Sequence, residues 1–394
     1  MKMFRQIGAV TAMNFRSLPQ RVSTSLVVVI GIAGVVAVLV SVLAMSTGLI
    51  RTMQNTGRDD RAIVMRNGAI AETSSALDRN SAKLVVDAEG IKRDAEGNPI
   101  TSAETMRILS LHKKQDDAEI NVILRGVGPK MLEVRPELKI IAGRMFQPAV
   151  TELIVGKAAQ AQFKGLNVGD VVSSRGANWT VVGVFETGGD AHESSLMTYA
   201  ETLISIDQRG SFQSVTALLE SPSAFQAFKD SLSANPGLAV DVVREREYYQ
   251  QQSKTMSTII SVIAYVVGGI MAVGAVFAAL NTMYSAVSAR LQEIATLRAL
   301  GFGSTAMVAS VLAEALVLAL IGGVIGALIA WLFFNGNTVS TSGGGMGQMV
   351  FELTVSPQLM ILGVVWACII GVLGGLFPAM RAARLPVAMA LRAI

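Results

Sequence analysis

Long apolar stretches divide the chain into one hydrophobic segment near the N-terminus, a long polar region, and further hydrophobic segments in the C-terminal third. Between Arg21 and Arg51 there is no Asp, Glu, Lys or His, and residues 23–50 exceed the roughly 20 apolar residues that cross a bilayer core as a helix. The same criterion predicts three more spans, at residues 255–289, 303–334 (interrupted only by Glu314) and 357–380. The pattern therefore predicts an α-helical membrane protein with four transmembrane helices.

The region between the first two spans, residues 51–254, has the pattern of a mixed α+β domain. Short segments rich in Val and Ile predict strands in AIVMRN, AEINVILRGV, TELIVG, DVVSSRG, NWTVVGVFE and SVTALLE. Helical spacing predicts helices in TSAETMRILSLHKK, LIVGKAAQAQFKGL and SPSAFQAFKDSLSANPG. One division of this region inserts a strand-rich lobe, 120–205, into an α/β lobe formed by 51–119 and 206–254.

The short segments that flank the spans set the orientation. Lys and Arg exceed the acidic residues in segments 1–22, 290–302 and 381–394. Because basic flanks are retained on the inner side of the membrane, these three segments are predicted to be cytoplasmic. The exported parts are then the domain 51–254 and the short loop 335–356. The first apolar stretch is longer than the core of a typical signal peptide, so we expect it to remain as an anchor.

Composition and charge agree with this topology. The hydrophobic share is 51% and the mean hydropathy is +0.50, values typical of a chain that is largely embedded in membrane lipid. The net charge of +4 comes from the cytoplasmic flanks, and it does not indicate a nucleic-acid partner.

Residue types that carry chemistry are sparse. Cys368, the only cysteine, lies in the last span, so no disulfide is expected in the exported domain. His112 and His192 have no His or Cys neighbour in the sequence, and we expect no metal site. A phosphate-binding loop needs GxxxxGK followed by Ser or Thr, and the nearest fragment, GKA at 156–158, lacks the hydroxyl. We therefore expect no catalytic residues, no nucleotide site and no cofactor on this chain.

The second span is longer than a bilayer requires. Its about 35 uncharged residues would extend to roughly 50 Å as one helix. Upstream, residues 245–258 are polar but contain no Gly or Pro, so we predict that the helix continues outside the membrane as a stalk, with residues 47–58 as its partner. The alternative is a long hydrophobic helix that tilts within the bilayer.

Residues 288–300 have the pattern of a short amphipathic helix that ends at Gly301. Its apolar residues recur at three-residue steps: Leu291, Ile294, Leu297 and Leu300. A short amphipathic helix at a membrane edge either lies on lipid or docks into a groove of a partner protein. Residues 4–18 are a weaker candidate for a second contact of this kind, or for an interfacial elbow.

Polar and small residues inside the spans have specific consequences. Glu314 is costly at that depth, so we expect it to face protein or water and to be hydrogen-bonded. Pro378 is expected to kink or end the last span. Small residues at four-residue spacing allow helices to approach closely, within one subunit or between two. The pairs are Gly322 with Gly326, Gly371 with Gly375, and Gly274 with Ala278.

Several segments resemble one family. RGVGPKMLEVRPELKIIAGRMF, TELIVGKAAQAQFKGLNVGDVVSSRGANWTVVGVF and REREYYQQQSKTMSTI resemble the extracytoplasmic domain of MacB-like ABC transporter permeases. ARLQEIATLRALGFG and FPAMRAARLPVAMALRAI are similar to the cytoplasmic signatures of the FtsX-like permease domain. The resemblance covers nearly the whole chain in the right order. It implies that 120–205 is a Sabre-like lobe and that 51–119 with 206–254 is a porter-like lobe.

The resemblance implies a permease subunit without a nucleotide site, which relays ATP-driven motion to a periplasmic domain for export of a periplasmic substrate. The helix in 290–302 would then dock on a cytoplasmic ABC ATPase, a separate chain that binds ATP and Mg. The residues implied in this coupling are Arg290, Glu293, Ile294, Leu297, Arg298 and Gly301. A further contact from the cytoplasmic tail is implied for Arg381, Arg384 and Pro386.

The implied surroundings are the bacterial inner membrane, with both termini cytoplasmic, and a dimer with a second permease copy or a paralogue. In a Gram-negative cell, a periplasmic membrane-fusion protein and an outer-membrane duct are further implied partners. Two alternatives share this layout. One is a lipoprotein-releasing permease of the LolC/LolE type, whose exported lobe binds lipoproteins, and the other is an FtsX-like regulator that does not transport. A stand-alone sensor or anchor would need no ATPase.

Overall fold

The computed structural model describes residues 6, 8, 10, 11, 13, 22–174, 176–207, 210–343 and 347–384. The chain forms two compact units. The helical unit consists of Met1–Thr47, Thr258–Asn337 and Leu353–Ile394, and the sheet unit consists of Gly48–Ser257 and Thr338–Glu352.

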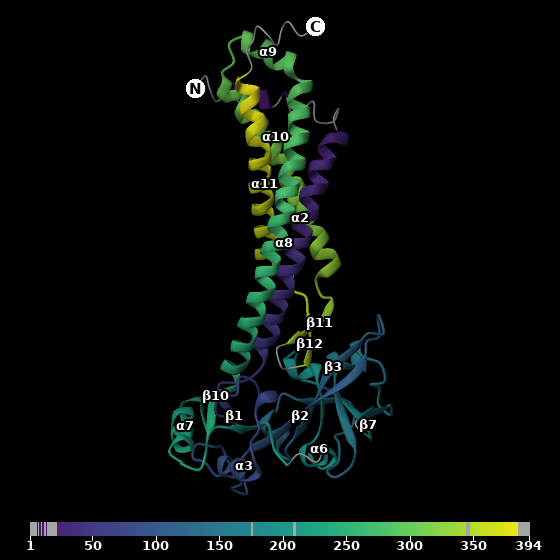
Figure 1. Cartoon of the computed structure of the whole chain (residues 1–394), viewed down its shortest axis with the longest axis vertical. Coiled ribbons are helices and arrows are strands. Elements are labelled where there is room, and N and C mark those ends of the chain that lie inside the picture. The colour runs from purple at the N-terminus through teal and green to yellow at the C-terminus, as the bar shows by residue number, and fades with distance from the viewer. Residues whose placement is uncertain are drawn as a thin grey trace. The chain divides into compact units, whose positions relative to one another are not determined.

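Within the described residues, four helices are long and apolar enough to cross a membrane, which confirms the four predicted spans. They are α2 (Val22–Asn55), α8 (Glu245–Ala289), α10 (Ser304–Phe334) and α11 (Pro357–Arg384). A short helix, α9 (Leu291–Ala299), lies between α8 and α10 in the sequence. In the helical unit, α2, α8, α10 and α11 run side by side (Figure 1).

The ends of these helices differ from the predicted spans in informative ways. α8 begins at Glu245, so the predicted continuation of the second span through 245–258 is confirmed as helix. α2 likewise continues to Asn55. α11 runs through Pro378 to Arg384, so this proline does not end the helix.

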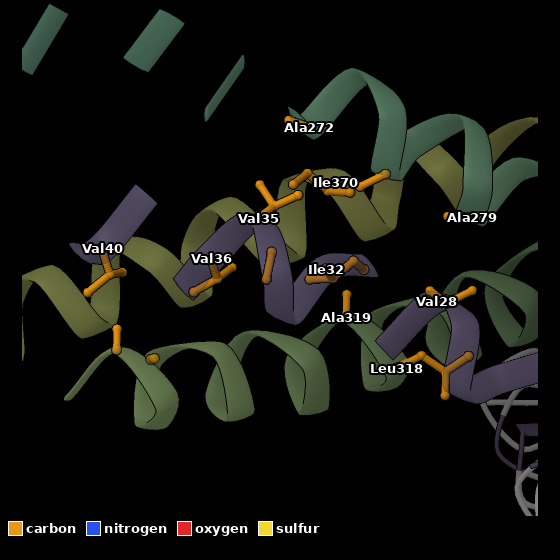
Figure 2. Packing of buried hydrophobic residues seen from close by; sticks show 14 of the residues in the cluster. Val28, Ile32, Val35, Val36, Val40, Ala272, Ala279, Leu318, Ala319 and Ile370 are labelled. Atoms are coloured by element: carbon orange, nitrogen blue, oxygen red, sulfur yellow. The ribbon is translucent and has the colours of Figure 1, made fainter. Parts of the chain in front are cut away.

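Buried side chains of all four helices meet in one cluster in the helical unit. Ile32 and Val36 of α2 lie against Ala319 of α10 and Ile370 of α11, and α8 contributes Ala272 and Ala279 (Figure 2). Lipid provides little hydrophobic drive between helices, so close packing of small side chains holds such a cluster together.

The predicted small-residue pairs have two different environments. A Cβ atom at Gly326 of α10 would lie 2.4 Å from the Ala33 carbonyl oxygen of α2, and one at Gly371 of α11 would lie 2.4 Å from the Ala319 Cβ of α10. These two helix contacts therefore require glycine. Around a Cβ at Gly274 of α8 nothing lies within 4 Å, so this position packs against no other part of the chain that the structure describes.

The sheet unit is built on one ten-stranded sheet with the order β10-β1-β9-β2-β3-β8-β5-β7-β4, and β6 pairs with β7. The strands are β1 (Arg61–Arg66), β2 (Thr101–His112), β3 (Glu119–Val127), β4 (Lys139–Gly143), β5 (Glu152–Gly156), β6 (Val171–Ser174), β7 (Ala177–Glu186), β8 (Leu196–Tyr199), β9 (Ser214–Leu218) and β10 (Val240–Arg244). The pairs β3–β8 and β5–β7 are parallel and the others are antiparallel.

Short helices complete this unit. The α-helices are α3 (Arg79–Val86), α4 (Met131–Val134), α5 (Lys157–Gln162), α6 (Ala200–Asp207) and α7 (Phe225–Ser233), and the 3-10 helices are η2 (Glu72–Ser74), η3 (Ala191–Ser194) and η4 (Pro222–Ala224). The unit is thus a mixed α+β domain, as predicted. The single sheet runs through both predicted lobes, and their boundary at 120–205 stays a prediction.

Two segments differ from their predicted structure. The segment 101–114, predicted as helix, contains β2, because pairing with β3 and β9 outweighs its helical spacing. Its side chains alternate, with Ile108 exposed and Leu109 buried. The segment 335–356, predicted as a short loop, contains an antiparallel hairpin of β11 (Thr338–Gly343) and β12 (Gly347–Glu352).

Candidate functional site

The predicted coupling segment forms a helix that starts directly after α8. α9 covers Leu291–Ala299, and Leu300 caps its C-terminus. Gly301 follows with a φ of +94°, a left-handed conformation that favours glycine, and its N–H donates to the Arg298 carbonyl at 3.0 Å. The predicted helix end at Gly301 is therefore confirmed.

Arg290, between α8 and α9, forms a two-pronged ion pair with Glu314 of α10. Its two terminal nitrogens lie 3.0 and 3.2 Å from the two carboxylate oxygens. Both side chains are buried, with 5% and 6% exposed. The expectation that Glu314 faces protein and is hydrogen-bonded is confirmed. The Arg290 side chain points into the chain's own interior and fixes the start of α9 against α10, and its part in ATPase coupling stays a prediction.

Two apolar residues of α9 pack against the helical unit itself. Ile294 is only 8% exposed and belongs to a cluster with Met283, Val287 and Met307. Leu297 is half-buried and packs against the same cluster. The Ile294 side chain therefore holds α9 onto its own bundle, and its part in ATPase coupling stays a prediction. The side of α9 left exposed carries Gln292, Glu293, Thr296, Ala299 and Leu300.

Basic residues connect α9 with the end of α11. Arg298 is half-buried and donates to the Ala383 carbonyl at 3.0 Å. The guanidinium of Arg381 lies over the ring of Tyr284 in α8, 5.5 Å from its centroid, an arrangement that favours a cation-π interaction. Arg384 is exposed at the end of α11.

Two predicted sites lie wholly or mostly outside the described residues. Pro386 is outside them, and its tail contact stays a prediction. The predicted N-terminal contact at 4–18 is described at five positions, of which Val10 is buried against the cluster around Ile294.

A group of buried charged residues, which the sequence did not single out, lies where α8 enters the sheet unit. Seven charged side chains alternate in sign along a chain of ion pairs. In order along the chain they are Glu137, Arg61, Glu245, Arg135, Glu104, Arg125 and Glu72. All except Glu137 are at most 7% exposed at the side chain. We call this set the ion-pair chain.

The ion-pair chain attaches the first residue of α8 to several strands. The Glu245 carboxylate lies 2.6 Å from the Arg61 Nε of β1 and 3.3 Å from an Arg135 terminal nitrogen. Arg135 reaches Glu104 of β2 at 2.5 Å, and Glu104 in turn pairs with Arg125 of β3. Buried charges of this kind are tolerated only when each has partners, so removal of one leaves its neighbours uncompensated.

The electrostatics of the ion-pair chain follow from its alternation. Burial alone would raise the pKa of Glu104, but Arg135 and Arg125 outweigh it and lower the pKa to about 2. For Arg125 and Arg135, burial acts to lower the pKa and the neighbouring carboxylates raise it above its usual range. Glu104, Arg125 and Arg135 are therefore charged at neutral pH.

The histidines are bound within the sheet unit's own hydrogen bonds. His192 is buried between Asp190 and Tyr249, at 3.1 and 3.2 Å, whereas His112 is exposed beside Asp117. Within the ranges that the structure describes, no three His, Cys, Asp or Glu side chains are grouped so that they could hold a metal ion.

Two family models match the chain. The model of the MacB-like periplasmic core domain matches residues 23–235, more than half of the chain, and the model of the FtsX-like permease C-terminal domain matches residues 256–387. The chain belongs to the MacB-like ABC transporter permeases. It is thus a transmembrane permease component with a periplasmic, MacB-like domain, and the structure supplies the helices and the mixed sheet that this family requires.

Curated relatives of this permease come from distant organisms. The macrolide export ATP-binding/permease protein MacB of Hahella chejuensis is 26% identical over 96% of this chain and 58% of its own length. An uncharacterized ABC transporter permease of Methanocaldococcus jannaschii is 26% identical over 56% of each chain. The MacB-like permease thus spans little more than half the length of these two relatives. The uncharacterized ABC transporter permease YknZ of Bacillus subtilis is 25% identical over 98% of this chain and 97% of its own length.

Two solved structures are similar to part of the chain. The extracellular domain of the ABC-type transporter YknZ from Gram-positive bacteria matches 47% of this chain and 100% of its own, at 16% identity and a TM-score of 0.35. The periplasmic region of MacB from Actinobacillus actinomycetemcomitans matches 54% and 97%, at 16% identity and a TM-score of 0.37.

Proposed function

We propose that this MacB-like permease works by mechanotransmission, in which a cytoplasmic ATPase displaces α9 and α8 relays the displacement to the sheet unit. The observation that carries the proposal is the continuity of α8, a single helix of 45 residues from Glu245 to Ala289. At 1.5 Å per residue, such a helix is about 67 Å long. Its first residue belongs to the ion-pair chain, and the residue after its last is Arg290, which is paired with Glu314. A helix fixed at both ends transmits displacement better than a flexible loop.

In this proposal the ATPase is a separate polypeptide that binds ATP and Mg, and it docks on the exposed side of α9. No GxxxxGK followed by Ser or Thr occurs in the 394 residues. Glu293 and Leu300 offer the ATPase one acidic and one apolar contact, since Leu300 is 72% exposed.

The substrate is handled on the exported side of the membrane. Glu314 is the one charged residue within the predicted spans, and Arg290 neutralises it, so the spans offer no charged path across the bilayer. The chain resides in a bacterial inner membrane. Both termini are cytoplasmic, because basic segments that flank membrane spans are retained on the cytoplasmic side. It pairs with a second copy or a paralogue and, in a Gram-negative cell, acts with a membrane-fusion protein and an outer-membrane duct.

The partners are tested by affinity purification of the full chain in mild detergent, with identification of each co-purifying protein. An ABC ATPase together with a membrane-fusion protein supports the export role. An ATPase together with lipoproteins supports the lipoprotein-releasing alternative, and an ATPase with a cell-wall hydrolase supports the regulatory one. Absence of any ATPase contradicts all three.

The docking surface is tested by the double variant Glu293→Arg with Leu300→Asp. We expect loss of the co-purifying ATPase, because both exposed side chains lie on the proposed contact. The matched control is Glu133→Arg with Leu132→Asp, the same chemical change at exposed positions of the sheet unit, and it should retain the ATPase. Retention of the ATPase by the α9 variant would show that α9 is not the coupling helix.

A further inference from the structure

Three segments connect the sheet unit covalently with the helical unit: the end of α2, the start of α8, and the β11–β12 hairpin between α10 and α11. Any displacement that passes along the chain between the units must pass through one of them. All three make hydrogen bonds to one four-residue element of the sheet unit, η3 (Ala191–Ser194).

The contacts of α2 and α8 with η3 are direct. The Ala191 N–H donates to the hydroxyl of Thr56, the residue that follows α2 by one position, at 2.9 Å. The Tyr249 hydroxyl of α8 lies 3.2 Å from the His192 Nε2. Thr56 has no exposed surface, and Tyr249 and His192 are at most 3% exposed. These hydrogen bonds are therefore shielded from competition with water.

The hairpin makes a paired contact with the same element. The Ser194 hydroxyl donates to the Val350 carbonyl at 3.1 Å and lies 2.9 Å from the Val350 N–H, which donates to it. Val350 of β12 is 3% exposed and belongs to a hydrophobic cluster with strands β2, β3, β5 and β7. One small side chain thus binds both backbone groups of a single hairpin residue.

Hydrogen bonds join η3 to the residues just before it. The Glu193 carboxylate accepts from the Thr187 N–H at 2.7 Å and from the Gly189 N–H at 2.8 Å. The Asp190 carboxylate accepts from the His192 N–H at 2.9 Å and contacts its ring. Burial would raise the pKa of Asp190, but His192 and these donors lower it, so the carboxylate stays charged and keeps its hydrogen bonds.

η3 is also placed to pass displacement to strands β5, β7 and β8. β7 ends just before it and β8 begins just after it. The Gly156 N–H at the end of β5 donates to the Ser195 carbonyl at 3.0 Å, and a Cβ at Gly156 would lie 2.1 Å from the Glu193 carbonyl oxygen. Strands β5, β7 and β8 are neighbours in the sheet, and β8 pairs with β3, where Arg125 of the ion-pair chain lies opposite Met197.

We infer that η3 is the receiving element of the permease, at which the motions of α2, α8 and the hairpin converge and from which they reach β5, β7 and β8. Thr56, Tyr249, His192 and Ser194 are its positioning residues. This inference rests on the proposed mechanotransmission. Through these residues the displacement enters strands β5, β7 and β8 of the sheet unit.

The test uses the double variant Tyr249→Phe with Ser194→Ala, in which each change removes one hydroxyl that contacts η3 or the hairpin. The matched control is Tyr248→Phe with Ser205→Ala. The Tyr248 hydroxyl binds the Glu72 N–H and the Ser205 hydroxyl binds within α6, so neither contacts η3. The full chain is studied in lipid nanodiscs with the ABC ATPase that co-purifies with it. Hydrogen–deuterium exchange is compared without nucleotide and after trapping with ATP and vanadate.

In the wild type and the control, we expect trapping to change exchange in peptides 288–302 and 187–199. In the double variant, the change at 187–199 should fall about threefold or more, as loss of buried hydrogen bonds would cause, while the change at 288–302 persists. Each single variant is measured too. If the double variant unfolds, the single variants provide the comparison. Two outcomes overturn the inference about η3 but leave the proposed function standing. One is an undiminished change in exchange at 187–199 in the double variant. The other is no change at 187–199 in the wild type while exchange at 288–302 does change. No response at 288–302 in the wild type overturns the proposed function as well.

Discussion

Glu104 shows how much one buried residue contributes to the sheet unit. Its pKa in the folded chain is about 2, below the usual 4.5, because two arginines outweigh the effect of its burial. A lowered pKa stabilises the folded state above the unfolded value, and this stability is lost as the pH falls through the folded value. The free energy of unfolding should therefore fall by about 3 kcal/mol between roughly pH 5 and pH 2 on account of this residue.

Denaturant unfolding of the full chain measures this, followed by the fluorescence of Trp179, which is buried in the sheet unit. Trp331 and Trp366 are first replaced by Phe. In the variant Glu104→Gln, the same fall in pH should lower the free energy of unfolding by less, because the amide does not titrate. An unchanged pH dependence in this variant would show that other carboxylates account for the effect.

The pair of Arg290 and Glu314 gives a second prediction for single residues. Arg290→Ala leaves the Glu314 carboxylate buried without its ion partner, so unfolding should become easier by about 3–5 kcal/mol. The double variant Arg290→Met with Glu314→Leu removes both charges and should recover most of this loss. Thermal unfolding in detergent measures both, with the exposed Arg384→Ala as control. Equal losses in the single and the double variant would contradict the role assigned to the pair.

Sequence reasoning identified some of these residues and missed others for physical reasons. The cost of an acidic residue in a span predicted that Glu314 needs a partner. The partner itself was not predicted, because Arg290 also fits the pattern of a basic flank. Glu104 was missed because its segment has helical spacing, and strand pairing with distant residues decided its structure. The available signal was Arg125, a charge inside the apolar strand INVILRGV.

Among the helices, close approach separates essential glycines from replaceable ones. Gly326→Leu should disrupt the contact of α10 with α2 and lower the thermal unfolding temperature, because its Cβ would meet the Ala33 carbonyl at 2.4 Å. Gly274→Leu should leave the fold of the single chain intact, since nothing lies within 4 Å of its Cβ. Thermal unfolding in detergent compares the two variants. A loss of stability from Gly274→Leu that persists in the monomer would contradict this assignment.

Helices were easier to predict than strands and loops. Long apolar intervals with at most one charged residue located all four spans, because a bilayer imposes both length and composition on a helix. The β11–β12 hairpin was not predicted, since its structure depends on contacts with the sheet, such as that of Ser194 with Val350. η3 was not predicted either, because an element of four residues is too short to show a periodic pattern in the sequence.

In the whole molecule, each of the two units holds one end of the segment α8–α9 in place. The helical unit fixes α9 through Arg290, Ile294 and Arg298, and the sheet unit holds the start of α8 through the ion-pair chain. The sequence predicted the order of these parts and their family. It did not predict which side chains attach them, because those pairs join residues far apart in the sequence.

The central claim is that α8 relays ATP-driven displacement to the sheet unit, and the variant Gln251→Pro tests it most directly. Gln251 is exposed on α8 within the sheet unit, and proline there breaks the helix by removing one backbone hydrogen bond and by steric conflict. Hydrogen–deuterium exchange of peptides covering β1 is compared before and after trapping with ATP and vanadate, in the full chain with its ATPase. Wild type and Gln251→Ala should show a nucleotide-dependent change, and Gln251→Pro should lose most of it while still binding the ATPase. An undiminished change in the proline variant would contradict the account.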